Sequence, residues 1–281
     1  MECADGEGAR NTKNNIMESI KRNIRGAYTI WYRDVVRFKR DRVRMLSSLG
    51  MPVVYLFVFG SGLSPAMAEM GGGHIDFKQF MFPGVLTMTV LFTSVFSAVS
   101  IVWDREFGFL KEVMVAPVSR VAVALGKVAG GSTVSLFQGL IVLLLAPVLG
   151  VDLSVSQLVT LIGLMVLLAI MMTALGILIA ARQTSMEGFH MMMNFVLLPM
   201  FFLSGAFFPL RGVPIWMELL SKLDPVTYGV DPLRQVSLRA LVPAELMNTI
   251  ALNPLTYNVI IMAAFSVLFL IPAVWLFGRQ K

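Results

Sequence analysis

The chain has 281 residues, of which 57% are hydrophobic and only 14% are charged. Soluble globular domains carry about 25% charged residues, and a mean hydropathy of +0.76 excludes an ordinary soluble protein. The formal net charge is +6. Because the apolar stretches are long and lack the alternating pattern of a membrane barrel, we expect an all-α integral membrane protein.

The N-terminal region divides into two parts. Residues 1–27 are polar with little periodicity, which predicts a flexible tail. Over residues 28–44, Trp31 and Tyr32 lie on an apolar helical face, and Arg37 belongs to the cationic side chains around it. This pattern predicts an amphipathic helix in the membrane interface. A solvated basic helix that precedes the first span is the alternative.

Six apolar runs follow, each close to the roughly 20 residues that cross a hydrocarbon core. They predict transmembrane helices at residues 45–63, 80–102, 121–149, 158–181, 189–208 and 257–277. The runs contain no Asp or Glu, and Lys127 and Glu187 lie near helix ends. Ion-driven transporters generally need ionisable groups at mid-membrane, so this pattern disfavours an ion-driven pump.

Lysine and arginine are distributed unevenly between the two sides. The segment before the first span contains eleven, and the connection between the second and third spans contains three. The opposite short connections contain only Lys78. By the positive-inside rule, both termini and the second connection are expected to be cytoplasmic.

The second connection, residues 103–120, is a charged segment between two apolar runs. Its apolar residues recur at offsets of four, three and four and therefore share one face of a short helix. They are Trp103, Phe107, Leu110 and Met114. Pro117 is expected to end this helix. An amphipathic helix at the mouth of two spans predicts a lever that a separate soluble protein can grip and move.

The connection between the fifth and sixth spans, residues 209–256, is the longest. Five prolines divide it, and apolar side chains recur between them. Such pieces are expected to lie at the outer interface or to dip into the membrane as a re-entrant hairpin covered by protein. A plain surface loop is the alternative.

The sequence lacks the motifs that several kinds of binding site or active site need. The chain has no GxxxxGK[ST] motif for nucleotide phosphates, and with one cysteine and two isolated histidines, His74 and His190, we expect no metal site. Hydroxyl-bearing residues within the spans usually serve helix packing. The second and fifth spans are rich in Phe and Met, which suit a cavity for varied apolar molecules.

Two stretches resemble the ABC-2 type membrane permeases, a family that includes the daunorubicin-resistance type drug exporters. The first comprises Asp104-Arg105-Glu106-Phe107-Gly108, then Leu110 and Ala116-Pro117-Val118-Ser119-Arg120. The second begins at Leu198, continues as PMFFLSGAFFPL over residues 199–210 and reaches Pro214 and Trp216. It then includes Asp224-Pro225-Val226-Thr227-Tyr228 and Asp231-Pro232-Leu233-Arg234. With six spans, the similarity covers about residues 28–278, so residues 45–278 are expected to form the transmembrane domain.

The resemblance implies a permease homodimer, or a heterodimer with a related chain, carried by two separate ABC ATPase subunits. Those subunits bind ATP and Mg, so no cofactor is expected in this chain. The residues implied to couple to the ATPase are Trp103, Asp104, Arg105, Glu106, Phe107, Gly108, Leu110 and Pro117, with Trp31, Tyr32 and Arg37 of the interfacial helix beside them. The residues implied to line a substrate path are Phe92, Phe96, Asn194, Leu197 and Met200.

The function implied is a transport subunit, not itself an enzyme, that exports hydrophobic drug-like or antibiotic-like molecules across a prokaryotic cytoplasmic (inner) membrane, as in multidrug efflux and antibiotic resistance. The alternative is an exporter of lipid-linked saccharide or polysaccharide by the same machinery. The chain has 20 Met and 20 Phe but four Trp and five Tyr, which favours drugs. Membrane lipid is an expected partner and nucleic acid is not. A membrane enzyme and an ion-coupled carrier or channel are the competing classes.

Overall fold

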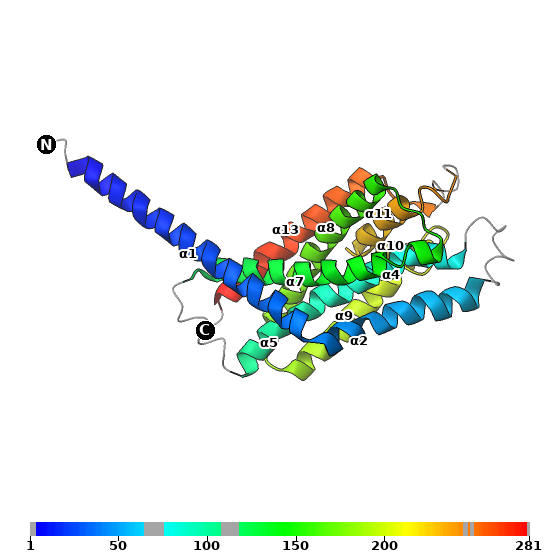
Figure 1. Cartoon of the computed structure of the whole chain (residues 1–281), viewed down its shortest axis with the longest axis horizontal. Coiled ribbons are helices and arrows are strands. Elements are labelled where there is room, and N and C mark those ends of the chain that lie inside the picture. The colour runs from blue at the N-terminus through cyan, green and yellow to red at the C-terminus, as the bar shows by residue number, and fades with distance from the viewer. Residues whose placement is uncertain (1–3, 65–75, 108–117, 244–246, 248–249, 280–281) are drawn as a thin grey trace.

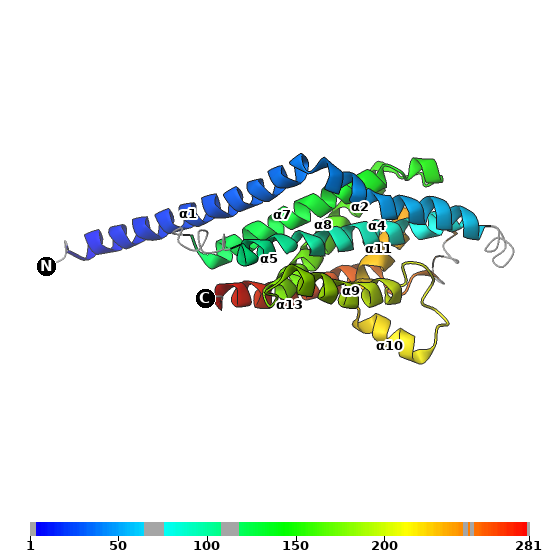
Figure 2. The same ribbon diagram turned by 90° about the horizontal axis from the view of Figure 1, so that it is seen from below.

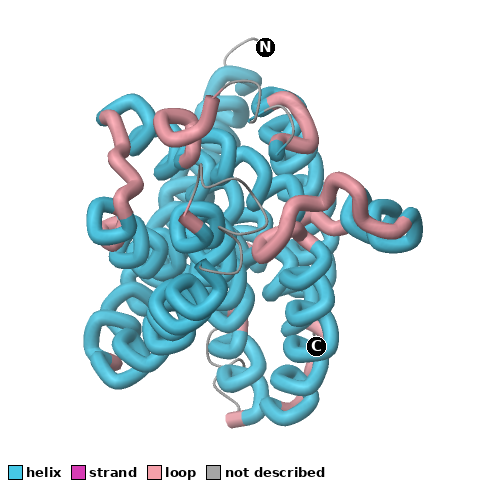
Figure 3. Tube along the Cα trace, turned by 90° about the vertical axis from the view of Figure 1, so that its right-hand side faces the viewer, coloured by secondary structure: helices cyan, strands magenta, loops and turns pink. Residues whose placement is uncertain are grey.

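The computed structural model describes residues 4–64, 76–107, 118–243, 247 and 250–279. In this part of the chain all regular structure is helical, and the end-on view shows only helices and loops (Figure 3). The predicted all-α class is therefore confirmed. Among the described residues, six helices are long and apolar enough to cross a membrane. They are Met45–Ser64, Phe77–Glu106, Arg120–Leu149, Val155–Ala180, Met186–Leu203 and Leu255–Leu276.

Polar caps set where the central helices begin. Asp76 accepts a hydrogen bond from the backbone N–H of Lys78 and starts α4, Phe77–Ser97. Ser119, Ser154 and Ser185 cap the next three helices in the same way, which are α7 (Arg120–Leu143), α8 (Val155–Ala180) and α9 (Met186–Leu203). A capping oxygen satisfies a backbone N–H that has no partner within the helix. Three predicted span starts fall three residues inside the helix because the apolar run begins one turn after its cap.

The N-terminal helix α1 runs without a break over Ala4–Arg40. It begins well before residue 28, so the flexible tail expected for residues 1–27 is helical from Ala4 onward. That tail contains no proline and several Glu, Lys and Arg residues, which are good helix formers. Figures 1 and 2 show α1 passing obliquely along the bundle and extending beyond the end at which α5 finishes.

Glycines allow α1 to lie close against α7. A Cβ atom added to Gly126 would lie 2.7 Å from the carbonyl oxygen of Ala27, and one added to Gly130 would lie 3.0 Å from Cβ of Asp34. Small residues at such crossings let helix backbones approach closely. The half-buried Trp31 donates from Nε1 to Thr133 Oγ1 at 3.0 Å. Trp31 thus contacts a helix of the bundle.

The first span combines α2, Arg42–Val54, with a turn of π-helix, Tyr55–Phe59. Pro52 lies inside α2 and has no N–H to donate to the preceding turn. A π-turn takes up one extra residue and changes the direction of the side chains that follow. Leu56 is fully buried, whereas Phe57 and Phe59 are exposed.

The second span is interrupted near its end. After α4, a break at Ala98 leads into α5, Val99–Glu106. Trp103 to Glu106 are therefore the last turns of the span, where the sequence predicted a separate helix. The rings of Trp103 and Phe107 meet edge to face with centroids 5.9 Å apart, so these two do share a face. Gly108, Leu110 and Pro117 lie outside the described residues.

The centre of the bundle is formed by α4, α7 and α8, which contact one another along their lengths. Most of α4 and α8 is buried, whereas few residues of α2, α9 and α13, Leu255–Arg279, are buried, and these helices lie toward the outside. The exposed faces are apolar, as expected for helices that meet lipid or another membrane subunit.

The long connection forms two short helices between prolines. α10, Ile215–Leu223, exposes an apolar stripe and stands away from the bundle in Figure 2. α11, Thr227–Ser237, is almost wholly buried and packs against α4, α8 and α13. Because α11 belongs to the core, this region is not a plain surface loop.

Candidate functional site

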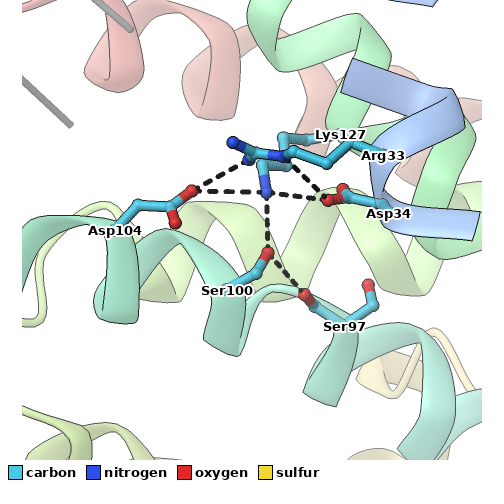
Figure 4. A network of polar contacts seen from close by, with 6 residues as sticks. All are labelled: Arg33, Asp34, Ser97, Ser100, Asp104 and Lys127. Atoms are coloured by element: carbon cyan, nitrogen blue, oxygen red, sulfur yellow. Dashed lines mark hydrogen bonds and ion pairs between the residues drawn. The ribbon is translucent and has the colours of Figure 1, made fainter. Parts of the chain in front are cut away.

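Three consecutive charged residues at the end of α5 each contact a different part of the bundle. We call Asp104, Arg105 and Glu106 the α5 joint. Asp104 Oδ2 accepts a hydrogen bond from Arg33 Nη2 at 3.1 Å and pairs with Lys127 Nζ at 3.6 Å. Figure 4 shows the two cations reaching Asp104 from α1 and α7. Asp104 therefore links α5 to both helices.

Arg105 holds the end of α8. Its guanidinium donates from Nη2 to the carbonyl oxygen of Ala181 at 3.2 Å and from Nη1 to the carbonyl oxygen of Gln183. The last carbonyl groups of a helix have no partner within it. A cation at this position satisfies them and also interacts favourably with the negative end of the helix dipole.

Glu106 holds the start of α9. Its Oε2 accepts a hydrogen bond at 3.2 Å from the backbone N–H of Met186, the first residue of that helix. Ser185 caps the same end by accepting from Gly188. A carboxylate beside a helix N-terminus is favourable because it faces the positive end of the dipole. The α5 joint thus connects the end of the second span with the turn between the fourth and fifth spans.

Helix α1 also contacts this end of α5. The guanidinium of Arg37 lies over the ring of Trp103, 4.7 Å from its centroid, a distance at which cation and ring attract. Tyr32 is 55% exposed and stacks with Tyr28 at 6.2 Å. The sequence placed Arg37 and Trp103 in separate segments, and the structure brings them together.

Phe92 and Phe96, two of the five predicted path residues, lie together on α4. Their rings stack with centroids 6.3 Å apart, and both are half-buried. On α9, Asn194 is exposed and Met200 is half-buried. Leu197 is fully buried in the core of the single chain, so it does not face an open surface there.

The two phenylalanines belong to a longer row of rings, which we call the aromatic series. Successive ring centroids lie 5.8, 6.3, 6.0, 5.1 and 5.4 Å apart, within the range of favourable ring contacts. Its members in order are His190, Phe96, Phe92, Phe201, Phe207 and Tyr55. The series crosses from α9 to α4, back to α9 and on to the π-turn of the first span.

From the sequence, His190, Phe207 and Tyr55 were not recognised as neighbours of the predicted path residues. His190 was set aside as an isolated histidine, and its position one residue from Phe189 gave no sign that it faces Phe96. Tyr55 reaches the series only because the first span lies beside the turn that follows α9. No local motif contains that information.

At the opposite end of the bundle, Asp231 of α11 ties this helix to the start of α13. Its carboxylate accepts hydrogen bonds from the backbone N–H groups of Leu252 and Asn253, both at 3.1 Å, and from the side-chain amides of Asn258 at 2.7 Å and Gln235 at 3.0 Å. Asp231 and Asn258 are both buried. Buried polar groups of this kind are tolerated because they are satisfied.

Arg234 ties α11 to the end of α9. Its Nη2 donates to the carbonyl oxygens of Gly205 at 2.6 Å and Ala206 at 3.1 Å, and its guanidinium lies over the ring of Phe80 at 4.3 Å. Gly84 lies so close to Ala206 that an added Cβ would collide with that backbone. The turn after α9 is therefore held between α4 and α11.

Asp224, just before α11, is a buried acid. Its Oδ1 accepts a hydrogen bond from the backbone N–H of Val226 at 2.9 Å, whereas Oδ2 has no partner among the described residues. Burial raises the pKa of Asp224 to about 8, although the Val226 hydrogen bond acts in the opposite direction. This carboxyl group is therefore protonated at neutral pH in the folded chain.

We expect stability to fall as pH rises from about 4 to 8. In the unfolded chain Asp224 has a pKa near 3.8, so over this range the folded state binds a proton that the unfolded state has lost, and each rise in pH favours unfolding. Asp224→Asn should flatten this slope when thermal unfolding is followed in detergent at several pH values. The exposed Asp152→Asn serves as the control. An unchanged slope in Asp224→Asn would exclude Asp224 as the titrating group.

The described residues contain no group of three His, Cys, Asp or Glu side chains that could hold a metal ion. Cys3 and His74 lie outside them. His190 contacts the rings of Phe96 and Phe189, a setting for packing and apolar contact.

The chain is similar to a known family of membrane proteins and to several of its members. Residues 25–238 match the family model for the ABC-2 type transporter. The chain is 29% identical to the putative transport permease ycf38 of Cyanophora paradoxa over 213 residues, covering 75% of this chain and 73% of the relative. It is 28% identical to the inner membrane transport permease YadH of Escherichia coli K12 over 211 residues, covering 73% and 80%. It is 26% identical to nodulation protein J of Rhizobium leguminosarum bv. trifolii over 212 residues, covering 74% and 80%. The chain therefore belongs to the ABC-2 type transporter family and is a membrane transport permease.

Proposed function

We propose that this chain is the membrane-spanning subunit of an ATP-driven exporter of hydrophobic small molecules such as drugs or antibiotics. Permeases of this family generally work with ABC ATPase subunits. In the proposed assembly two permease copies and two ATPase subunits act together, and the ATPases bind ATP and Mg. The apolar helices α2, α9 and α13, in which few residues are buried, support a second membrane subunit or lipid as neighbours.

The proposed location is the cytoplasmic (inner) membrane of a prokaryote, with both termini in the cytoplasm. The relative YadH is named an inner membrane transport permease. The excess of Lys and Arg in α1 and around the α5 joint supports this orientation. In this orientation the α5 joint faces the side on which the ATPase would bind, and α11 with its buried Asp231 lies toward the outside.

The observation that carries the proposal is the connection between the α5 joint and α9. Glu106 contacts the first residue of α9, and the same helix supplies His190 and Phe201 to the aromatic series. A force applied to the end of α5 therefore reaches the rings of the proposed path through one helix. If inward-open and outward-open states bind substrate with different affinity, this movement converts ATP binding into export.

A lipid-linked saccharide or polysaccharide is the second candidate cargo. The aromatic series favours it, because its rings other than the buried Phe201 give repeated apolar surfaces to an extended amphipathic chain. Both cargoes would use the same α5 joint and the same partner ATPase. A drug needs a single large pocket, whereas the saccharide needs the whole row of rings.

We expect Phe96→Ala to lower export of an apolar dye from cells about fivefold, because an aromatic contact contributes about 1 kcal/mol. Met200→Ala should lower export by a similar factor, because a methionine side chain in contact with an aromatic or apolar molecule contributes about as much. Phe269→Ala is the matched control, since Phe265 and Phe269 also form a half-buried i,i+4 ring pair but lie on α13, away from the series. Unchanged export of every tested substrate in Phe96→Ala and Met200→Ala would remove these residues from the path.

The two cargo classes are separated by Tyr55→Ala at the far end of the series. A saccharide that slides along all the rings should be exported less well by Tyr55→Ala and by Phe96→Ala. A compact drug should be affected mainly by Phe96→Ala, because Phe96 and Tyr55 are separated by three other rings.

A further inference from the structure

Lys127 is the most deeply buried charge beside the α5 joint. Its Nζ lies 2.8 Å from Ser100 Oγ, 3.2 Å from Asp34 Oδ1 and 3.6 Å from Asp104 Oδ2. Only 5% of the lysine side chain is exposed, against 15% for Asp34 and 13% for Asp104. The ammonium group thus sits between carboxylates from α1 and α5 (Figure 4). From the sequence, Lys127 was placed only near the end of a span, with no partner assigned.

The cluster is balanced in charge. Arg33 contacts Asp104 at 3.1 Å and lies 3.9 Å from Asp34, so two cations face two carboxylates. Removing one partner of a buried pair leaves an uncompensated charge, which is strongly unfavourable. The helices α1, α5 and α7 therefore each contribute a charged side chain that stabilises the buried charges of the other two.

The surroundings limit the ways in which α1 can move alone. Gly126 and Gly130 lie on either side of Lys127 in α7, and both are packed directly against α1. If α1 moved away from α5, Asp34 would leave the ammonium group while Asp104 stayed. If α5 moved away, Asp104 would leave both cations. Either movement separates buried opposite charges.

We propose that Lys127 of α7 is a positioning residue that fixes α1 to the α5 joint, so that α1, the end of α5 and the first turns of α7 move as one body. The lever of the proposed function then includes α1 as well as the end of α5, a consequence that rests on that function. The attachment of α1 to the α5 joint does not depend on the proposed function. It is a property of this chain in its membrane environment, and it can be measured without an ATPase or a substrate.

The test is hydrogen–deuterium exchange, read by mass spectrometry, on the full chain in lipid nanodiscs. Lys127→Met keeps much of the volume of the side chain and removes its charge. We expect exchange in residues 29–38 of α1 and residues 99–106 of α5 to become about tenfold faster, with α8 and α13 unchanged, since local openings have their own free energies. Lys127→Arg keeps the charge and should restore most of the protection.

Two further variants keep the outcome decisive. Asp34→Asn removes only the carboxylate that α1 contributes, and it should loosen residues 29–38 while leaving residues 99–106 protected through Asp104. Lys222→Met is the control, because Lys222 forms an exposed i,i+4 pair with Glu218 at 2.7 Å on α10, where ion pairs contribute little. Protection in α1 that is unchanged by Lys127→Met would overturn the proposal, and so would equal loss of protection in all helices.

Discussion

Asp231→Ala is expected to lower the free energy of unfolding by about 4 kcal/mol, because it leaves buried donors without an acceptor, and each such group costs about 1–3 kcal/mol. The donors include the side-chain amide of Asn258, which is fully buried, and the backbone N–H groups of Leu252 and Asn253. The loss should appear in denaturant unfolding of the purified chain in detergent micelles. α11 should also lose protection before the central helices, because Asp231 is its link to the start of α13.

Asp231→Asn gives a graded comparison, since an amide keeps one acceptor oxygen but adds donors that the site cannot satisfy. The free energy of unfolding of Asp231→Asn should lie between those of the wild type and Asp231→Ala. Asp152→Ala is the control, because Asp152 is an exposed acid at the same end of the bundle. If Asp231→Ala were no less stable than Asp152→Ala, the buried hydrogen bonds would contribute little, and α11 would be held by its apolar contacts alone.

The six spans could be predicted from the sequence because each signal is local. A hydrocarbon core requires about 20 apolar residues, and runs of that length are visible without knowledge of their neighbours. The errors at the span starts also have a local cause. Ser154 and Ser185 are polar, so hydropathy excludes them and the turn they cap, yet their side chains begin α8 and α9. Reading the cap residues first would have placed these boundaries more closely.

The extent of α1 shows the limit of local reasoning. A polar segment without periodic apolar residues predicted a flexible tail, but α1 is continuous from Ala4. Its second half packs on Gly126 and Gly130 of α7, and packing partners supply most of the stability of a helix. Those glycines lie 86 or more residues after the end of α1 in the sequence, with no signal that connects the two segments.

The α5 joint was found by motif but its contacts were not. Asp104, Arg105 and Glu106 follow one another, so they point in three directions around a helix, and from the sequence they indicated a surface for a partner. In the structure these directions lead to α1 and α7, to the end of α8 and to the start of α9. Lys127 and Asp34 were missed as members for the same reason, because a pair between distant helices leaves no spacing to read.

Glu106→Arg is expected to lower the ATPase activity that co-purifies with the tagged chain from gently solubilised membranes by about tenfold or more, since a charge-assisted hydrogen bond contributes about 1.5–3 kcal/mol. Two effects combine. The variant removes a carboxylate from the face proposed to dock the ATPase, and it places a cation beside the positive end of α9, where Met186 has lost its acceptor. Export should fall with it, because α9 supplies rings to the aromatic series.

Glu106→Gln separates these two roles. The amide oxygen can still accept from Met186, so the start of α9 should stay protected in hydrogen exchange, while the charge available to the partner is lost. Reduced co-purification with normal protection would assign Glu106 to docking, and normal co-purification with reduced export would assign it to α9. Glu187→Arg, a charge change in the first turn of α9 itself, is the control for the dipole effect. If the wild-type chain brings down no ATPase at all, the exporter proposal fails, whereas the attachment of α1 through Lys127 can still hold.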